Sequence, residues 1–153
     1  MKLNHDYVRD ILLYIENNIG YKDSSNPNSH KMIRFGKFFE NDIFENYNKE
    51  GLKYALELLI KEKFVECSKE PHFVDGNLMS ANIIGLTWNG HALLDNIRND
   101  TIWNAVKEKS KKIGKVSITT LASTAGTLAN AMMTNPNALD NFMQGIANIK
   151  GIL

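Results

Sequence analysis

Hydrophobic residues recur at helical spacing in two long stretches of this chain. In both, the apolar side chains fall three and four residues apart, which places them on one face of a helix that packs against a core. The polar residues between them occupy the opposite face. The two predicted helices span residues 6–17, with Val8, Ile11, Leu12 and Ile15 on the apolar face, and residues 50–64, with Leu52, Ala55, Leu56, Leu59, Ile60 and Phe64.

Shorter segments around the second helix have the pattern of strands and turns. Residues 33–38 roughly alternate apolar and polar side chains, as a half-buried strand does. Residues 41–47 are predicted to form a short helix with Ile43 and Phe44 pointing inward. After the long helix, we expect a strand at residues 64–67, a hairpin loop at 70–80 and a return strand at 81–86.

The segment Leu86–His91 joins a strand directly to a helix. Thr87 stands where a helix N-cap is expected, because its hydroxyl can accept a hydrogen bond from a free backbone N–H one turn later. Apolar residues then resume at helical spacing, which predicts a helix over residues 88–98. A further helix, capped by Asp100, is expected to end near Gly114.

This order of elements is that of a winged helix-turn-helix. A helix, a strand, a short helix and a long helix are followed by a two-stranded wing. We therefore predict a mainly α protein with a small β-sheet, of the α+β class, in which residues 1–115 form a winged-helix domain. Additional C-terminal helices are expected beyond this domain.

Residues 116–153 differ in composition from the rest of the chain. They contain two charged residues, Asp140 and Lys150, and are rich in Ala, Thr, Asn and Met. Two helices with many small residues are predicted, at 117–133 and 138–149. Small residues three and four apart permit close helix approach, so this extension is a candidate surface for self-association or for another protein.

Composition narrows the class of protein. At 153 residues, with 43% hydrophobic and 23% charged side chains, the chain has the length and balance of a single globular domain. Its single cysteine, Cys67, cannot form an internal disulfide. No stretch has the apolar length of a transmembrane helix or the pattern of a secretion signal. We expect a cytoplasmic protein with no membrane span.

Charge is unevenly distributed, although the net charge is only +1. Residues 101–153 carry six Lys and Arg against two Asp and Glu, and five of these lysines fall between residues 107 and 115. Such a run is typical of an anion-binding surface or of a solvated helix face. The candidate nucleic-acid contacts are Lys107, Lys111 and Lys112 in this run, and Lys49, Lys53 and Lys61 on the long helix, where Glu50, Glu57 and Glu62 interrupt them.

The run Leu86-Thr87-Trp88-Asn89-Gly90-His91, with Asp95, Arg98 and Trp103 after it, resembles a bacterial and prophage family, domain of unknown function 2513. The resemblance covers roughly residues 1–115 and includes the helical segments at 6–16 and 54–60. It implies a winged-helix-like fold, an association with mobile elements and no established activity. The resemblance therefore adds fold and context but no chemistry.

No residues are spaced like a catalytic, metal or cofactor site. The four histidines are not at metal-ligand spacing, and no glycine-rich phosphate loop occurs. His91 and Asp95, one helical turn apart, are more simply a helix-stabilising pair than a catalytic dyad. For Trp88 and Trp103, packing in the core is favoured over stacking on bases. A structural role is therefore predicted for Thr87, Trp88, Gly90, His91, Asp95 and Trp103, and the protein is predicted not to be an enzyme.

Two functions remain open from the sequence. The first is a DNA-binding regulator or accessory factor, which rests on the predicted fold and on the lysine run. The alternative is a protein–protein interaction or assembly module without nucleic-acid binding. This alternative rests on the weakly charged long helix and on residues 116–153.

Overall fold

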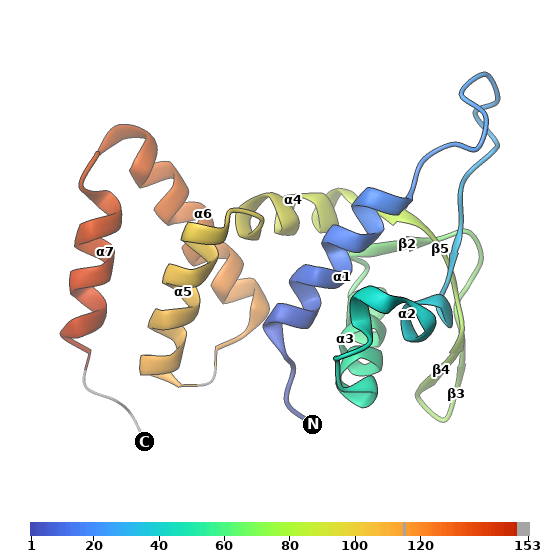
Figure 1. Cartoon of the computed structure of the whole chain (residues 1–153), viewed down its shortest axis with the longest axis horizontal. Coiled ribbons are helices and arrows are strands. Elements are labelled where there is room, and N and C mark those ends of the chain that lie inside the picture. Colours follow the sequence, from blue (N-terminus) through green and yellow to red (C-terminus); the bar gives the residue numbers. More distant parts are fainter. Residues whose placement is uncertain (115, 150–153) are drawn as a thin grey trace. The chain divides into compact units, whose positions relative to one another are not determined.

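A computed structural model describes residues 1–114 and 116–149. Within these residues the chain forms seven α-helices and two small antiparallel sheets (Figure 1). The predicted α+β class with a small β component is confirmed. The chain divides into two compact units, Met1–His91 and Ala92–Leu153. The boundary predicted after residue 115 lies beside Lys115, which is outside the described residues.

The first unit is built around two helices that pack against each other, α1 (His5–Asn18) and α3 (Lys49–Lys61). Asn4 caps α1, since its side-chain oxygen accepts hydrogen bonds from the N–H groups of Asp6 and Tyr7. The predicted apolar faces of both helices are buried, with the exception of Phe64, which lies beyond the end of α3 and is partly exposed. The periodicity of the sequence therefore located the core of this unit correctly.

A three-stranded sheet packs beside these helices. It contains β1 (Ile33–Arg34), β2 (Val65–Cys67) and β5 (Asn82–Leu86) in the order β1-β5-β2, with both pairs antiparallel. The central strand β5 buries Ile83 and Leu86. The strands predicted before and after the hairpin loop are thus present, and they pair with each other as expected.

The segment between β1 and α3 differs from the prediction. The strand stops at Arg34, and the second half of the predicted strand is a short helix, α2 (Lys37–Glu40), which buries Phe38. A 3₁₀ turn, η1 (Asp42–Phe44), replaces the short α-helix expected over residues 41–47. Phe44 points inward as predicted, whereas Ile43 is 62% exposed. Neighbouring residues in a single tight turn face different directions, so both could not be buried.

The predicted hairpin loop at residues 70–80 contains a second sheet. Strands β3 (His72–Val74) and β4 (Asn77–Ser80) pair antiparallel. The two residues between them, Asp75 and Gly76, have φ values of 50° and 80°. Two positive φ values suit the two-residue turn that joins twisted antiparallel strands, and Asp-Gly is a preferred sequence for that turn. Because both strands are short and mainly exposed, their alternation was too weak to predict them.

The strand-to-helix junction at Thr87 ties three segments together. The Thr87 hydroxyl accepts a hydrogen bond from the Gly90 N–H (3.1 Å), which confirms the predicted N-cap of α4 (Trp88–Ile97). The same hydroxyl donates to the Lys63 carbonyl (2.7 Å), and the Thr87 N–H donates to the Phe64 carbonyl (3.1 Å). Thr87 therefore also fixes the corner between α3 and β2, a second role that the sequence did not indicate.

The two tryptophans have opposite environments. Trp103 is 2% exposed, which confirms its predicted packing. Trp88 is 87% exposed, so the prediction that it packs in the core is wrong. Trp88 begins α4, and the buried positions on either side of it belong to Leu86 and Gly90. Residues two apart in a helix lie on nearly opposite sides, so with Gly90 against the α3–β2 corner, Trp88 faces solvent.

The second unit contains the later part of α4 with α5 (Asp100–Ile113), α6 (Ile118–Thr134) and α7 (Ala138–Ala147). The helices α5, α6 and α7 contact one another pairwise. Asn99, rather than the predicted Asp100, caps α5 by accepting a hydrogen bond from the Ile102 N–H (3.0 Å). Gly114, with φ 110°, ends this helix as predicted. The two expected C-terminal helices are present.

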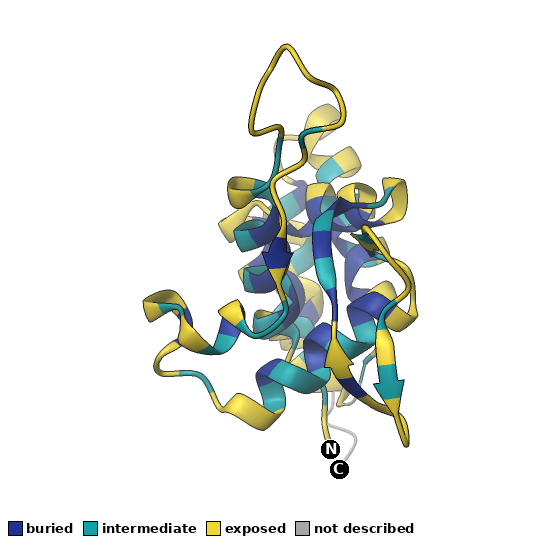
Figure 2. Cartoon of the chain, turned by 90° about the vertical axis from the view of Figure 1, so that its right-hand side faces the viewer, coloured by how far each residue is buried: buried dark blue, intermediate teal, exposed yellow. Residues whose placement is uncertain are grey.

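A long exposed loop leaves the first unit between α1 and β1 and is exposed along most of its length (Figure 2). Its base is closed by a hydrogen bond from the Lys31 N–H to the Gly20 carbonyl (2.8 Å) and by ring contact between Tyr21 and His30. Inside it, Asp23 and Ser29 hold the turns through side-chain hydrogen bonds. The Ser, Asn and Pro residues of this segment favour such a loop over a helix or a strand.

Replacement of Gly90 by alanine is expected to destabilise the first unit. An added Cβ would lie 2.0 Å from the Phe64 carbonyl oxygen, so the start of α4 or the α3–β2 corner must shift. We expect Gly90→Ala to lower the free energy of unfolding by about 3 kcal/mol. At Gly36, in the same unit, an added Cβ meets nothing within 4 Å. Denaturant unfolding of Gly36→Ala should therefore remain within about 0.5 kcal/mol of the unaltered chain. Equal effects of the two changes would show that the close approach at Gly90 is not a constraint.

Candidate functional site

The outward face of α3 carries the lysines predicted to contact nucleic acid. Lys49, Lys53 and Lys61 recur at multiples of four residues, so they share one side of the helix, with Glu57 between the last two. The opposite side is buried in the core. The structure therefore brings these three lysines to one face of α3. Whether they can contact a nucleic acid depends on what packs against that face.

The β3–β4 hairpin is fastened to this face through Glu57. The Leu78 N–H donates a hydrogen bond to Glu57 Oε1 (2.9 Å), and the Lys53 ammonium lies 3.7 Å from the same oxygen. The Glu57 side chain is only 12% exposed. One carboxylate thus satisfies a main-chain donor of the hairpin and pairs with a candidate DNA-binding lysine.

Lys61 makes a second attachment at the tip of the hairpin. Its ammonium donates a hydrogen bond to the Gly76 carbonyl (3.2 Å) and lies 5.2 Å from the centre of the Phe73 ring. A lysine above an aromatic face gains a favourable cation–π interaction. Lys53 and Lys61 are therefore engaged within the molecule, although Lys61 stays exposed, as does Lys49 at the first turn of α3.

The lysine run in α5 is divided between packing and solvent. Lys107 lies 5.7 Å from the centre of the Trp103 ring, and Lys109 lies 4.7 Å from that of Phe142. Lys111 and Lys112 are exposed in the last turn of α5, where positive charge stabilises the carbonyl end of a helix. These lysines belong to the second unit, whereas those of α3 belong to the first.

One side of α6, made of two alanines and two leucines, packs within the second unit. Leu121, Ala122, Ala125 and Leu128 are buried on the side of α6 that meets its neighbouring helices. At the far end of this helix, Met133 is 84% exposed. Part of the surface predicted for a partner is therefore used by the chain itself.

Polar residues that looked chemically suggestive in α4 have ordinary roles. Asp95 accepts hydrogen bonds from the Arg98 guanidinium at 2.7 and 3.2 Å, so its partner is Arg98 and not the predicted His91. His91 is exposed.

The single cysteine, in β2, is not set up as a reactive thiol. Burial, with Glu70 and Glu66 nearby, raises the pKa of the Cys67 thiol, which favours the unreactive protonated form. Across residues 1–114 and 116–149, no three metal-ligating side chains gather in one place.

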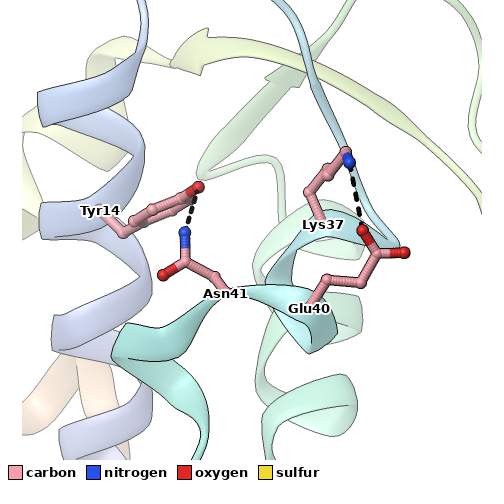
Figure 3. Close-up of polar contacts among 4 residues, drawn as sticks. All are labelled: Tyr14, Lys37, Glu40 and Asn41. Carbon is pink, nitrogen blue, oxygen red and sulfur yellow. Dashed lines mark hydrogen bonds and ion pairs between the residues drawn. The ribbon is translucent and has the colours of Figure 1, made fainter.

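A polar depression between α1 and α2 was not predicted from the sequence. It has a volume of about 320 Å³ and is bordered by Tyr14, Lys37, Glu40 and Asn41 (Figure 3). Asn41 donates a hydrogen bond to the Tyr14 hydroxyl (2.9 Å) while its oxygen accepts from the Ile43 N–H (2.9 Å). Lys37 and Glu40 form an exposed ion pair at 3.1 Å. These polar groups are hydrogen-bonded or ion-paired with one another, and Asn41 is the N-cap of η1. The polar lining of the depression is therefore explained without a ligand.

Residues 2–117 match the family described as hypothetical protein (DUF2513). The chain belongs to this family. A protein of Haemophilus influenzae (strain ATCC 51907 / DSM 11121 / KW20 / Rd), named an uncharacterized protein, is 33% identical over 135 residues, covering 87% of this chain and 99% of that protein. No solved structure matches. The resemblance to domain of unknown function 2513 is thereby confirmed.

The match to DUF2513 covers the first unit from residue 2 onward and all of α5, so it includes the hairpin, α3 and the exposed lysines of α5. The description of the family names no activity. None of the helices in the described part of the chain has the length and apolar character needed to cross a membrane.

Loss of the Glu57 carboxylate is expected to release the hairpin. In Glu57→Ala the Leu78 N–H loses its acceptor, so its hydrogen exchange should accelerate by about tenfold or more, given the usual strength of a hydrogen bond to a charged group. Glu62→Ala is the control, because Glu62 is an exposed glutamate at the end of the same helix. Amide exchange followed by NMR or mass spectrometry measures both variants. Unchanged exchange at Leu78 in Glu57→Ala would show that the hairpin is held by other contacts.

Proposed function

We propose that this DUF2513 protein contains a winged helix that serves as a protein-interaction module and does not read DNA through its long helix. The order of elements supports the winged-helix assignment. The sheet order β1-β5-β2, in which β5 pairs with both β1 and β2, supports it as well. In this assignment α3 is the recognition helix and the β3–β4 hairpin forms the wing.

The attachment of the wing to the recognition helix carries the functional proposal. A recognition helix enters the major groove with its outward side chains free to meet base edges and phosphates. Here Glu57 holds the Leu78 N–H and Lys61 holds the Gly76 carbonyl on that side of α3. The hairpin would have to leave before this face could enter a groove, and two candidate phosphate contacts would lose their present partners.

The charge of the first unit supports the same conclusion. Residues 1–91 carry 11 Lys and Arg against 13 Asp and Glu. Binding to a phosphate backbone depends on an excess of positive charge at the contact surface. The exposed surface also includes large apolar side chains, among them Trp88, Met79 and Val74. Exposed aromatic and apolar side chains are typical of contacts with proteins.

DNA binding by a regulator or accessory factor is the second candidate. It is favoured by the exposed pair Lys111 and Lys112, which, among the residues that the structure describes, do not lie over an aromatic ring as Lys107 and Lys109 do. The second candidate also includes the prophage association that the family resemblance implies, and a cytoplasmic location. In this case binding would be independent of sequence, because α5 would contribute phosphate contacts alone.

Titration of a fluorescent random-sequence duplex at low salt separates the two candidates. The interaction module should give no saturable anisotropy change up to about 100 μM, the weak end of ordinary non-specific binding. The double variant Lys111→Ala/Lys112→Ala should then behave like the unaltered chain. Lys22→Ala/Lys31→Ala, which removes two exposed lysines from the long loop, is the matched control.

The opposite result would have three parts. The duplex would bind, the affinity would fall steeply with added salt, and only Lys111→Ala/Lys112→Ala would weaken it. That outcome would establish DNA binding through α5 and would overturn the proposal of a module without nucleic-acid binding.

A further inference from the structure

The strand β2 has an open edge. In the described part of the chain, the sheet order β1-β5-β2 gives β2 a neighbour on one side only. The Phe64 carbonyl and the Ser68 N–H bond toward β5 and its flanking residues. Because hydrogen-bonding direction alternates along a strand, the main-chain groups of Val65 and Cys67 point away from β5. This edge therefore offers donors and acceptors to a further strand.

A groove of about 460 Å³ lies along this edge. Its apolar lining comes from Ile60 in α3, Val65 in β2 and Phe73 in β3. An alternating peptide strand places every second side chain on the same face, so such a lining can receive apolar residues of an added strand. The groove thus combines a main-chain edge with an apolar surface.

Three lysines from different segments also line the groove. Lys61 is at the end of α3, Lys63 at the α3–β2 corner and Lys69 in the connection to β3. Glu70 is the acidic residue among the lining side chains. Lys63 and Lys69 are exposed. Lysines beside an edge strand repel a second copy of the same edge, which prevents self-pairing, but they attract a strand of opposite charge.

We propose that this groove binds an extended acidic segment of a partner protein, which adds as a strand to the edge of β2. The main chain of the segment pairs with Val65 and Cys67, and its carboxylates meet Lys63 and Lys69. This inference rests on the proposed function as a protein-interaction module, and it supplies the chemistry of the partner.

A peptide fits this groove better than a nucleic acid does. The edge presents alternating N–H and C=O groups, which match another peptide main chain and do not match a row of phosphates. Glu66 and Glu70 lie in and next to β2 and would repel a continuous phosphate backbone. Carboxylates on alternate residues of a short strand can meet the lysines without meeting these two glutamates.

The test is an NMR titration of the isotope-labelled full chain with a blocked peptide in which aspartate alternates with valine. Binding should perturb the amides of Val65, Glu66 and Cys67, with weak affinity because the edge is short. A peptide with lysine in place of aspartate should not bind. Lys63→Glu/Lys69→Glu should weaken binding by about tenfold or more, since like charges then face each other. Lys22→Glu/Lys31→Glu should leave it unchanged.

Main-chain methylation distinguishes strand addition from simple charge attraction. A strand uses the N–H groups of every second residue to pair with its neighbour. In two otherwise identical peptides methylated on alternate sets of main-chain nitrogens, one should lose binding and the other should keep it. Equal binding of both peptides, perturbations away from β2, or no perturbation at millimolar peptide would overturn the inference.

The result is separable from that of the duplex titration. If neither the duplex nor the acidic peptide binds, the strand-addition inference fails and the interaction module without nucleic-acid binding survives. If the duplex binds through Lys111 and Lys112, the proposed function fails whatever the peptide does. Perturbation of the β2 amides by a single-stranded oligonucleotide, with no effect of the peptide, would overturn the strand-addition inference in favour of nucleic acid.

Discussion

The close contact between the α3–β2 corner and the start of α4 is the constraint on which the first unit depends. Lys63 adopts a positive φ of 59°, which turns the chain from helix into strand. Its carbonyl and that of Phe64 are both bound by Thr87, and the Gly90 backbone passes directly over Phe64. A side chain at residue 90 would separate these segments. The groove, the edge of β2 and the position of α4 all follow from this corner.

A few charged side chains of the first unit are used for contacts within the molecule. A glutamate in the middle of α3 first appears to spoil a DNA-binding surface, and the structure gives it a positive role as the acceptor for the Leu78 N–H. Lys53 and Lys61 then stabilise the same arrangement. The hairpin thereby lies against the outward face of α3, and the exposed Lys63 and Lys69 lie at the open edge of β2. Because of this internal pairing, the proposed binding site lies at the edge of the sheet and not on the helix.

The sequence predicted what depends on local periodicity and failed where tertiary contacts decide. The apolar faces of α1 and α3 and the cap at Thr87 were all correct, because each is determined within a few residues. The strands β3 and β4 were missed, since Leu78 is the buried residue of the pair and its partner Glu57 is distant in sequence. Trp88 was misplaced because the side of α4 that faces the core is determined by the contact of Gly90 with the α3–β2 corner, which is distant in sequence. The motif from Leu86 to Trp103, which resembles the family, carries no information about these long-range contacts.

The division between the two units falls inside α4, between His91 and Ala92. A helix of 10 residues is too short to persist alone in water, because nucleation is costly and few hydrogen bonds repay it. Thr87 and Gly90 anchor its first turn in one unit, while Leu94 and Ile97 are buried later in the helix. The start of α4 is therefore held by contacts that lie within the first unit. Without these anchors the first turn of α4 would fray, because the leading N–H groups of a helix have no partner within the helix itself.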